Sequence, residues 1–218
     1  MKIPGIIPTN FLRGEYLRMH ERTVLKRIER FGAIIVFLLM IIRMWLGTEI
    51  NGILLSALVI FSIGYMWSGF FLFSRVSLRD LATPKSRSQV SPFMVVSSIV
   101  MGFIYSFCTL AVIYGIFFYS GMNFMLSLAF FFILASTSIT IAYHWLNKAD
   151  RPLLRQYYKR SAVMGILCLA LWVIPVDTKL QFLFREHPEF IEAYKAYREN
   201  PDNPVVHERL RSARSYFR

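Results

Sequence analysis

The sequence predicts an all-α integral membrane protein, with about five transmembrane helices in a bundle, an N-terminal amphipathic helix and a C-terminal helical hairpin. Three observations predict this class. The 218 residues are 56% hydrophobic and only 17% charged, whereas an average soluble domain is about 45–50% apolar and about 25% charged. Residues 52–73 and 93–146 contain no Asp, Glu, Lys or Arg, and basic residues gather beside these stretches. Collagen-like and disulfide-stapled classes are excluded by the 11 Gly and two Cys.

Five apolar stretches are candidate membrane spans, because a helix needs roughly 20 mostly apolar residues to cross. They lie near residues 31–48, 52–73, 93–118, 124–146 and 161–177. The last is the shortest, and a re-entrant or interfacial helix is its structural alternative. The chain therefore divides into a basic amphipathic segment at 1–30, a transmembrane bundle at 31–177 and an extramembrane hairpin tail at 178–218.

The basic residues predict which side of the membrane each loop faces. Residues 1–30 carry seven Lys or Arg, the 75–92 loop four and the 147–160 loop five, whereas the short loops at 48–51 and 119–123 carry none. Cytoplasmic loops are the basic ones, so the N-terminus and both long loops are expected in the cytoplasm. Five spans then place the tail on the periplasmic side of a bacterial inner (plasma) membrane. A re-entrant fifth segment would leave the tail in the cytoplasm.

Residues 11–31 have the pattern of a basic amphipathic helix that leads into the first span. Apolar residues recur at helical spacing, and basic residues repeat every four positions on another face: Arg18, Arg22, Lys26 and Arg30. This face is expected to contact anionic lipid headgroups or an acidic partner. The alternative is a solvated face that acts only as a topology determinant. Nucleic acid is not an expected partner, because the basic residues lie at the ends of the spans.

Arg43 is the one charged residue inside a predicted span, close to the outer end of that span. A guanidinium group can reach the interface while its stem stays in the apolar layer, so we expect Arg43 to anchor the helix by contact with lipid. The alternative is an ion pair with Glu49 or with an acidic residue of a partner subunit.

Small residues predict where the helices pack closely. A stripe spaced by four in the third span is formed by Ser98, Gly102 and Ser106, and Gly64 and Ser68 repeat the spacing in the second span. Small side chains let two backbones approach in lipid. The pattern predicts an interface without identifying what packs there.

The fourth span carries four hydroxyl residues: Ser136, Thr137, Ser138 and Thr140. We expect them to bond to helix carbonyl groups, and the alternative is that they line a polar path. His144 and Asp150 at the inner boundary are the only candidates for chemistry on a lipid. No motif predicts catalytic, cofactor-binding or metal-ligating residues, and Cys108 and Cys168 have no metal-ligand spacing.

The tail has the pattern of two short helices, at 188–199 and 204–217, separated by a two-proline turn. Its candidate contact residues are Tyr194, Tyr197, Leu210 and Phe217. The segment AYKAYRENPDNPVVHERLRSARSYF resembles the junction between successive tetratricopeptide-type helices. One such unit cannot stack into a solenoid, so the resemblance implies no repeat-protein function. The apolar faces are expected to dock on the bundle or on another protein.

These features predict a non-catalytic multi-pass subunit or scaffold of a larger membrane complex, of a secretion, motility or envelope type. It would act through helix packing and its extramembrane tail, with anionic lipids and other membrane-protein subunits as partners and without a cofactor. One alternative is a small transporter or channel-like protein that uses the hydroxyl residues of the fourth span. The other is a membrane enzyme acting on lipid.

Overall fold

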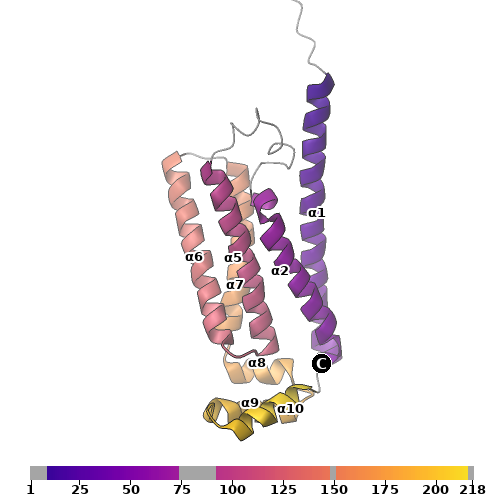
Figure 1. The fold of residues 1–218 in the computed structure, drawn as a ribbon, viewed down its shortest axis with the longest axis vertical. Helices are drawn as coiled ribbons and strands as arrows, with labels where there is room; N and C mark the ends of the chain where they lie inside the picture. Colours follow the sequence, from indigo (N-terminus) through magenta and orange to yellow (C-terminus); the bar gives the residue numbers. More distant parts are fainter. Residues whose placement is uncertain (1–8, 74–91, 148–150, 216–218) are drawn as a thin grey trace, which may run out of the picture.

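The computed structural model describes residues 9–73, 92–147 and 151–215, and every regular element in these ranges is a helix (Figure 1). The elements are α1 (Thr9–Leu46), the short 3-10 helix η1 (Gly47–Ile50), α2 (Asn51–Phe73), α5 (Pro92–Phe117), α6 (Met122–Asn147), α7 (Arg151–Val173), α8 (Val176–Leu183), α9 (Pro188–Glu199) and α10 (Pro204–Ser215).

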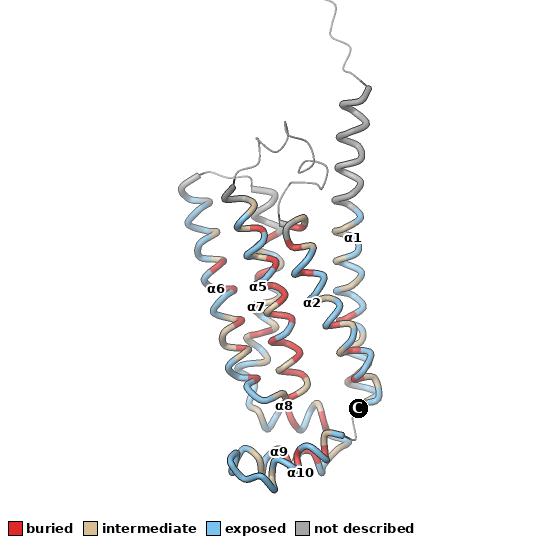
Figure 2. The backbone as a smooth tube through the Cα atoms, in the orientation of Figure 1, coloured by how far each residue is buried: buried red, intermediate tan, exposed pale blue. Residues whose placement is uncertain are grey.

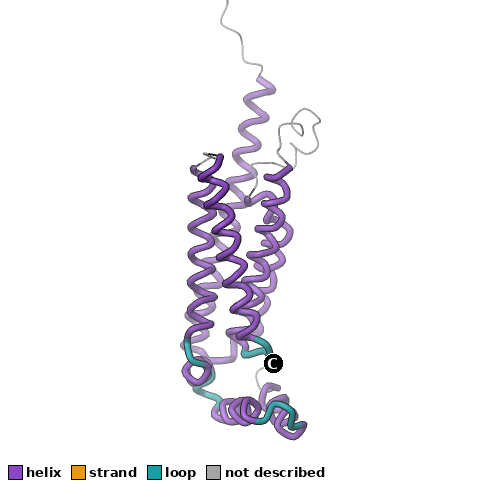
Figure 3. The backbone as a smooth tube through the Cα atoms, turned by 90° about the vertical axis from the view of Figure 1, so that its left-hand side faces the viewer, coloured by secondary structure: helices purple, strands orange, loops and turns teal. Residues whose placement is uncertain are grey.

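The five long helices lie side by side and alternate in direction along the chain (Figures 1 and 3). Helices α2 and α6 finish at one end of the bundle, where α5 and α7 begin. We call this end the basic end. The opposite end, which holds η1, the α5–α6 turn, α8, α9 and α10, is the tail end. The N-terminal part of α1 extends beyond the other helices at the basic end.

Helix α5 is the centre of the bundle, because it contacts α2, α6 and α7. Within its apolar stretch 56% of the residues are buried, against 28% in α2 and 22% in α6. Figure 2 shows where the buried positions lie along each helix, and most of the buried side chains are apolar. The main cluster joins Leu54 of α2, Cys108 and Val112 of α5, Leu126 of α6 and Cys168 of α7. Helix α1 packs mainly on α2 and lies at the edge.

Helices α2 and α5 touch through their backbones at Gly69 and Gly102. A Cβ atom added to Gly102 would lie 3.0 Å from the Cα of Gly69 and 2.9 Å from the carbonyl oxygen of Tyr65. Ser98 and Ser106 are buried on the same face of α5, and the Ser106 hydroxyl lies 2.9 Å from the Ser62 hydroxyl. The stripe at 98, 102 and 106 therefore faces α2.

Gly64 is not the glycine that meets this stripe. It is exposed, and a Cβ atom added to it would meet nothing within 4 Å. Ser68 donates its hydroxyl to the carbonyl of Gly64 within the same helix. Gly69 lies five positions after Gly64 in the helix. Because each residue turns a helix by about 100°, the two glycines point in different directions.

The segment predicted as one span at 161–177 is interrupted. Helix α7 already begins at Arg151 and ends at Val173, and α8 starts at Val176 after a bend of 102°. Pro175 between them has no amide proton to continue the helix and restricts the residue before it. Helix α8, which the sequence patterns did not predict, runs across the tail end of the bundle (Figure 1).

Among the described residues, three helices are long and apolar enough to cross a membrane: α2, α5 and α6. The number becomes four if the bent pair α7 and α8 is one crossing. Helix α1 is more mixed, because its last 18 residues include Glu29, Arg30 and Arg43.

The glycine contact between α2 and α5 can be tested by a substitution that adds one methyl group. Gly102→Ala should lower the free energy of unfolding by about 1–3 kcal/mol, because the added group forces the two backbones apart. Gly64→Ala is the matched control, and there the free energy should stay the same or rise by up to about 1 kcal/mol. Denaturant unfolding of the purified chain in detergent measures both. Equal effects would contradict the close contact.

Candidate functional site at the tail end of the bundle

The turn between α5 and α6 organises the tail end. Phe118 adopts a left-handed backbone conformation, with φ of 52°, and Gly121 follows with φ of 80°. Such a conformation costs a non-glycine residue about 1–3 kcal/mol, so it persists only where surrounding contacts fix it. Here the fully buried Phe118 ring makes edge-to-face contacts with Phe184 at 5.5 Å and with Tyr194 at 5.3 Å.

The C-terminal hairpin is docked on this turn. Phe190 and Ala193 of α9 and Leu210 and Ala213 of α10 are buried in one apolar cluster with Phe118. The hairpin thus covers its apolar faces against the bundle.

The predicted tail contacts therefore face inward. Tyr194 packs on Phe118, and Tyr197 packs edge-to-face on His207 at 4.8 Å within the hairpin. Leu210 belongs to the buried cluster. Burial, with a smaller effect of the neighbouring Tyr197, raises the pKa of the Tyr194 phenol, which therefore stays neutral. Phe217 lies outside the described residues.

Three cationic side chains donate hydrogen bonds to carbonyl groups near the C-terminal ends of α5 and α7. The pairs are Arg43 Nη1 to Ile116 O at 3.3 Å, Arg214 Nη2 to Phe118 O at 2.8 Å, and Lys179 Nζ to Leu171 O at 2.6 Å. The last carbonyls of a helix lack partners within that helix, and the negative end of the helix dipole attracts cations. These bonds tie α1, α8 and α10 to the bundle.

Arg43 differs from its predicted role. The residue is only 4% exposed, so its side chain is packed within the protein and does not extend to the surface. Its guanidinium carbon lies 5.1 Å from the ring centroid of Phe117 and 5.3 Å from that of Phe184. It makes no ion pair with Glu49, which is exposed. Arg43 Nε and Nη2 are buried and have no hydrogen-bond partner among the described residues.

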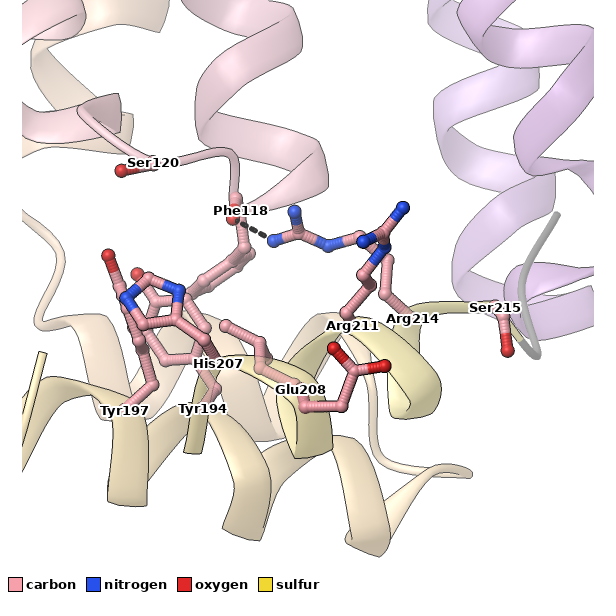
Figure 4. A pocket seen from close by; sticks show the side chains of 10 residues that line it. Phe118, Ser120, Tyr194, Tyr197, His207, Glu208, Arg211, Arg214 and Ser215 are labelled. Carbon is pink, nitrogen blue, oxygen red and sulfur yellow. Dashed lines mark hydrogen bonds between the residues drawn. The ribbon is translucent and has the colours of Figure 1, made fainter. Parts of the chain in front are cut away.

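An open cavity of about 550 Å³ lies between the α5–α6 turn and the hairpin (Figure 4). Its lining residues come from both sides: Phe118, Ser120, Tyr194, Tyr197, His207, Glu208, Leu210, Arg211, Arg214 and Ser215. Aromatic rings and guanidinium groups suit the binding of a ligand or a side chain. Among the described residues, no three His, Cys, Asp or Glu side chains are grouped as metal ligands would be.

A second polar cluster lies toward the basic end, where an ion pair joins Glu29 of α1 to Arg160 of α7. The Tyr65 hydroxyl of α2 donates to the other oxygen of Glu29 over 3.2 Å. Both charged side chains are only 12% exposed. Sequence reasoning missed this pair, although one signal was present: Glu29 is an acid within a basic segment, two residues before the predicted first span.

Three of the four predicted hydroxyl residues of α6 lie on one side of the helix, and Ser138 lies on another. Ser136 is buried and accepts a hydrogen bond from the Tyr157 hydroxyl at 2.9 Å. Thr140 donates to the Ser136 carbonyl at 2.7 Å, whereas Ser138 is exposed. Ser136 and Thr140 therefore bond to protein groups, as predicted for helix packing, and the polar path along this helix stays a prediction.

The basic ladder of the N-terminal segment continues directly into the bundle, because α1 is one helix from Thr9 to Leu46. Arg30 is exposed and Lys26 is partly exposed. Arg18 and Arg22 lie on this helix, but their side chains, like that of His144, fall outside the described part. Asp150 also lies outside the described residues.

Comparison with known proteins gives no relative for this chain: no protein-family model, no curated protein and no solved structure matches it.

The pair of Glu29 and Arg160 should stabilise the basic end. Glu29→Gln is expected to lower the free energy of unfolding by about 1–3 kcal/mol, because it leaves a largely buried guanidinium without its carboxylate. The control Asp177→Asn removes the exposed ion pair with Arg198, and it should change the free energy of unfolding by less than about 0.5 kcal/mol. Denaturant unfolding in detergent measures both variants. A Glu29→Gln effect no larger than that of Asp177→Asn would show that the buried pair adds nothing.

Proposed function

We propose that this chain is a non-catalytic, multi-pass subunit of a larger membrane complex of a secretion, motility or envelope type. One observation carries the proposal: a folded hairpin is fixed to one end of a helical bundle, and an open cavity of about 550 Å³ is lined by both. A rigid surface outside the apolar helices that combines aromatic and charged side chains has the chemistry of a protein-binding site.

The hairpin is suited to contact a folded partner rather than lipid. Its apolar side chains are already buried against the bundle, as Phe190, Ala193 and Leu210 are. The side chains that remain exposed are mostly polar or charged, and Glu208 and Arg211 are among those at the cavity. A partner that brings an acidic or aromatic side chain into the cavity would find complementary groups there.

We further propose that all five long helices cross the membrane, with the basic end in the cytoplasm and the tail end in the periplasm of a bacterial inner membrane. Helices α1 and α7 lie alongside the three most apolar helices (Figures 1 and 3). Their basic parts lie at the same end of the bundle, which agrees with the rule that basic segments remain inside. Anionic headgroups on that side would contact the basic face of α1.

Topology can be tested with reporter proteins that are active on only one side of the membrane. A reporter fused after Arg218 should give a periplasmic signal, and the same reporter inserted after Asp150 should give a cytoplasmic one. A cytoplasmic signal from both positions would contradict the fifth crossing and would place the hairpin inside the cell.

Partner binding can be tested by reversing one charge at the cavity. Arg211→Glu should reduce the amount of co-purifying partner at least about fivefold after mild solubilisation, because it changes the charge of the binding surface. Lys195→Glu reverses a charge at an exposed hairpin position that does not line the cavity, and it should retain the partner. Quantitative mass spectrometry of the purified complexes measures both. A monodisperse chain without partners would contradict the proposal.

A further inference from the structure

A second cavity, of about 400 Å³, lies beside the open one at the tail end. It is bounded by the start of α2, the end of α5, the α5–α6 turn, the segment around α8 and α9, and α10. Most of its wall is apolar or aromatic, including Leu55, Phe117 and Phe190. Two of its lining groups are a carboxamide, that of Asn51, and a guanidinium, that of Arg214.

Asn51 is the first sign of a ligand. The residue is 5% exposed, and its Oδ1 atom has no hydrogen-bond partner among the described residues. An unsatisfied buried carbonyl oxygen is unfavourable, and such an atom in a folded protein calls for an explanation. Because a carboxamide carries both donors and an acceptor, it can donate its NH₂ group to an anion after a half-turn of the amide.

One guanidinium group lines the cavity, and a second lies against two rings of its wall. Arg214 lines it, with its guanidinium carbon 5.5 Å from the ring centroid of Tyr119. Arg43 lies over Phe117 and Phe184, two rings that belong to the cavity wall. None of the described residues that line the cavity is Asp or Glu. A buried cation is stabilised by a nearby anion, so the surroundings favour a negatively charged occupant.

The location of the cavity indicates what carries the negative charge. The cavity lies where the long apolar helices α2 and α5 meet the tail end, which is the level of lipid headgroups for a chain that crosses the membrane. Its volume is within the range of about 300–1,000 Å³ that is typical of ligand sites. We propose that this cavity binds the phosphate group of an anionic lipid, with the lipid's apolar part against Leu55 and Phe117. This inference rests on the proposed membrane crossing but not on partner binding at the hairpin.

The experiment uses the full chain in detergent and three probes: dihexanoyl phosphatidic acid, dihexanoyl phosphatidylcholine and inorganic phosphate. Native mass spectrometry and ligand-induced shifts in unfolding temperature measure binding. Phosphatidic acid should bind more tightly than the other two. Equal affinity for inorganic phosphate would overturn the lipid assignment, and equal affinity for phosphatidylcholine would overturn the requirement for net negative charge.

Two substitutions at one position test the site itself. Gly52 lines the cavity, and a Cβ atom added to it would meet nothing within 4 Å. Gly52→Glu should weaken binding of phosphatidic acid about tenfold or more, because its carboxylate repels the phosphate and competes for the guanidinium. The glutamine side chain of Gly52→Gln has nearly the shape of glutamate without its charge. This variant should weaken binding of phosphatidic acid less than about threefold. Equal effects of the two substitutions would overturn the proposal.

A third variant separates binding from folding. Asn51→Leu removes the unsatisfied amide at similar size, so it should weaken binding of phosphatidic acid while the unfolding temperature of the unliganded chain stays the same or rises. Unchanged binding in this variant would overturn the role of Asn51.

Discussion

The carbonyl groups at the ends of α5 and α7 are the constraint on which the tail end depends. Both helices point their C-termini to the same end of the bundle, so their unsatisfied carbonyls and the negative ends of their dipoles come together there. A buried carbonyl group that has no partner costs free energy. The cations that supply the partners, Arg43, Lys179 and Arg214, belong to three different helices. Satisfying two helix ends therefore also fixes the positions of α1, α8 and the hairpin.

The packing of α2 against α5 depends on a different contact. Gly69 and Gly102 allow α2 and α5 to approach until their backbones touch, which increases the dispersion contacts between the two helices. Toward the basic end, the ion pair of Glu29 and Arg160 joins α1 to α7 with Tyr65 between. Polar contacts thus join α1 to α7 and fix the tail end, and close backbone packing joins α2 to α5.

The guanidinium group of Arg214 has two roles at the tail end. Arg214 binds the Phe118 carbonyl, which docks the hairpin, and it also lines both the open cavity and the smaller one beside it. Residues that fix the fold and residues proposed to bind a partner or a lipid are therefore neighbours. A ligand in either cavity would contact the group that fixes the hairpin, so its binding would also stabilise the docked hairpin.

The sequence by itself determined the local features of this chain. The apolar helices α2, α5 and α6, the first hairpin helix at Pro188–Glu199 and the start of the second at Pro204 lie where run lengths, prolines and helical spacing predict them. Only the tertiary structure decided the contacts between distant residues. Gly102 meets Gly69 rather than Gly64, Arg43 binds a carbonyl 73 residues away, and Glu29 pairs with Arg160 across 131 residues. Helix formation follows from neighbouring residues, whereas the rotation and depth of each helix follow from packing against the others.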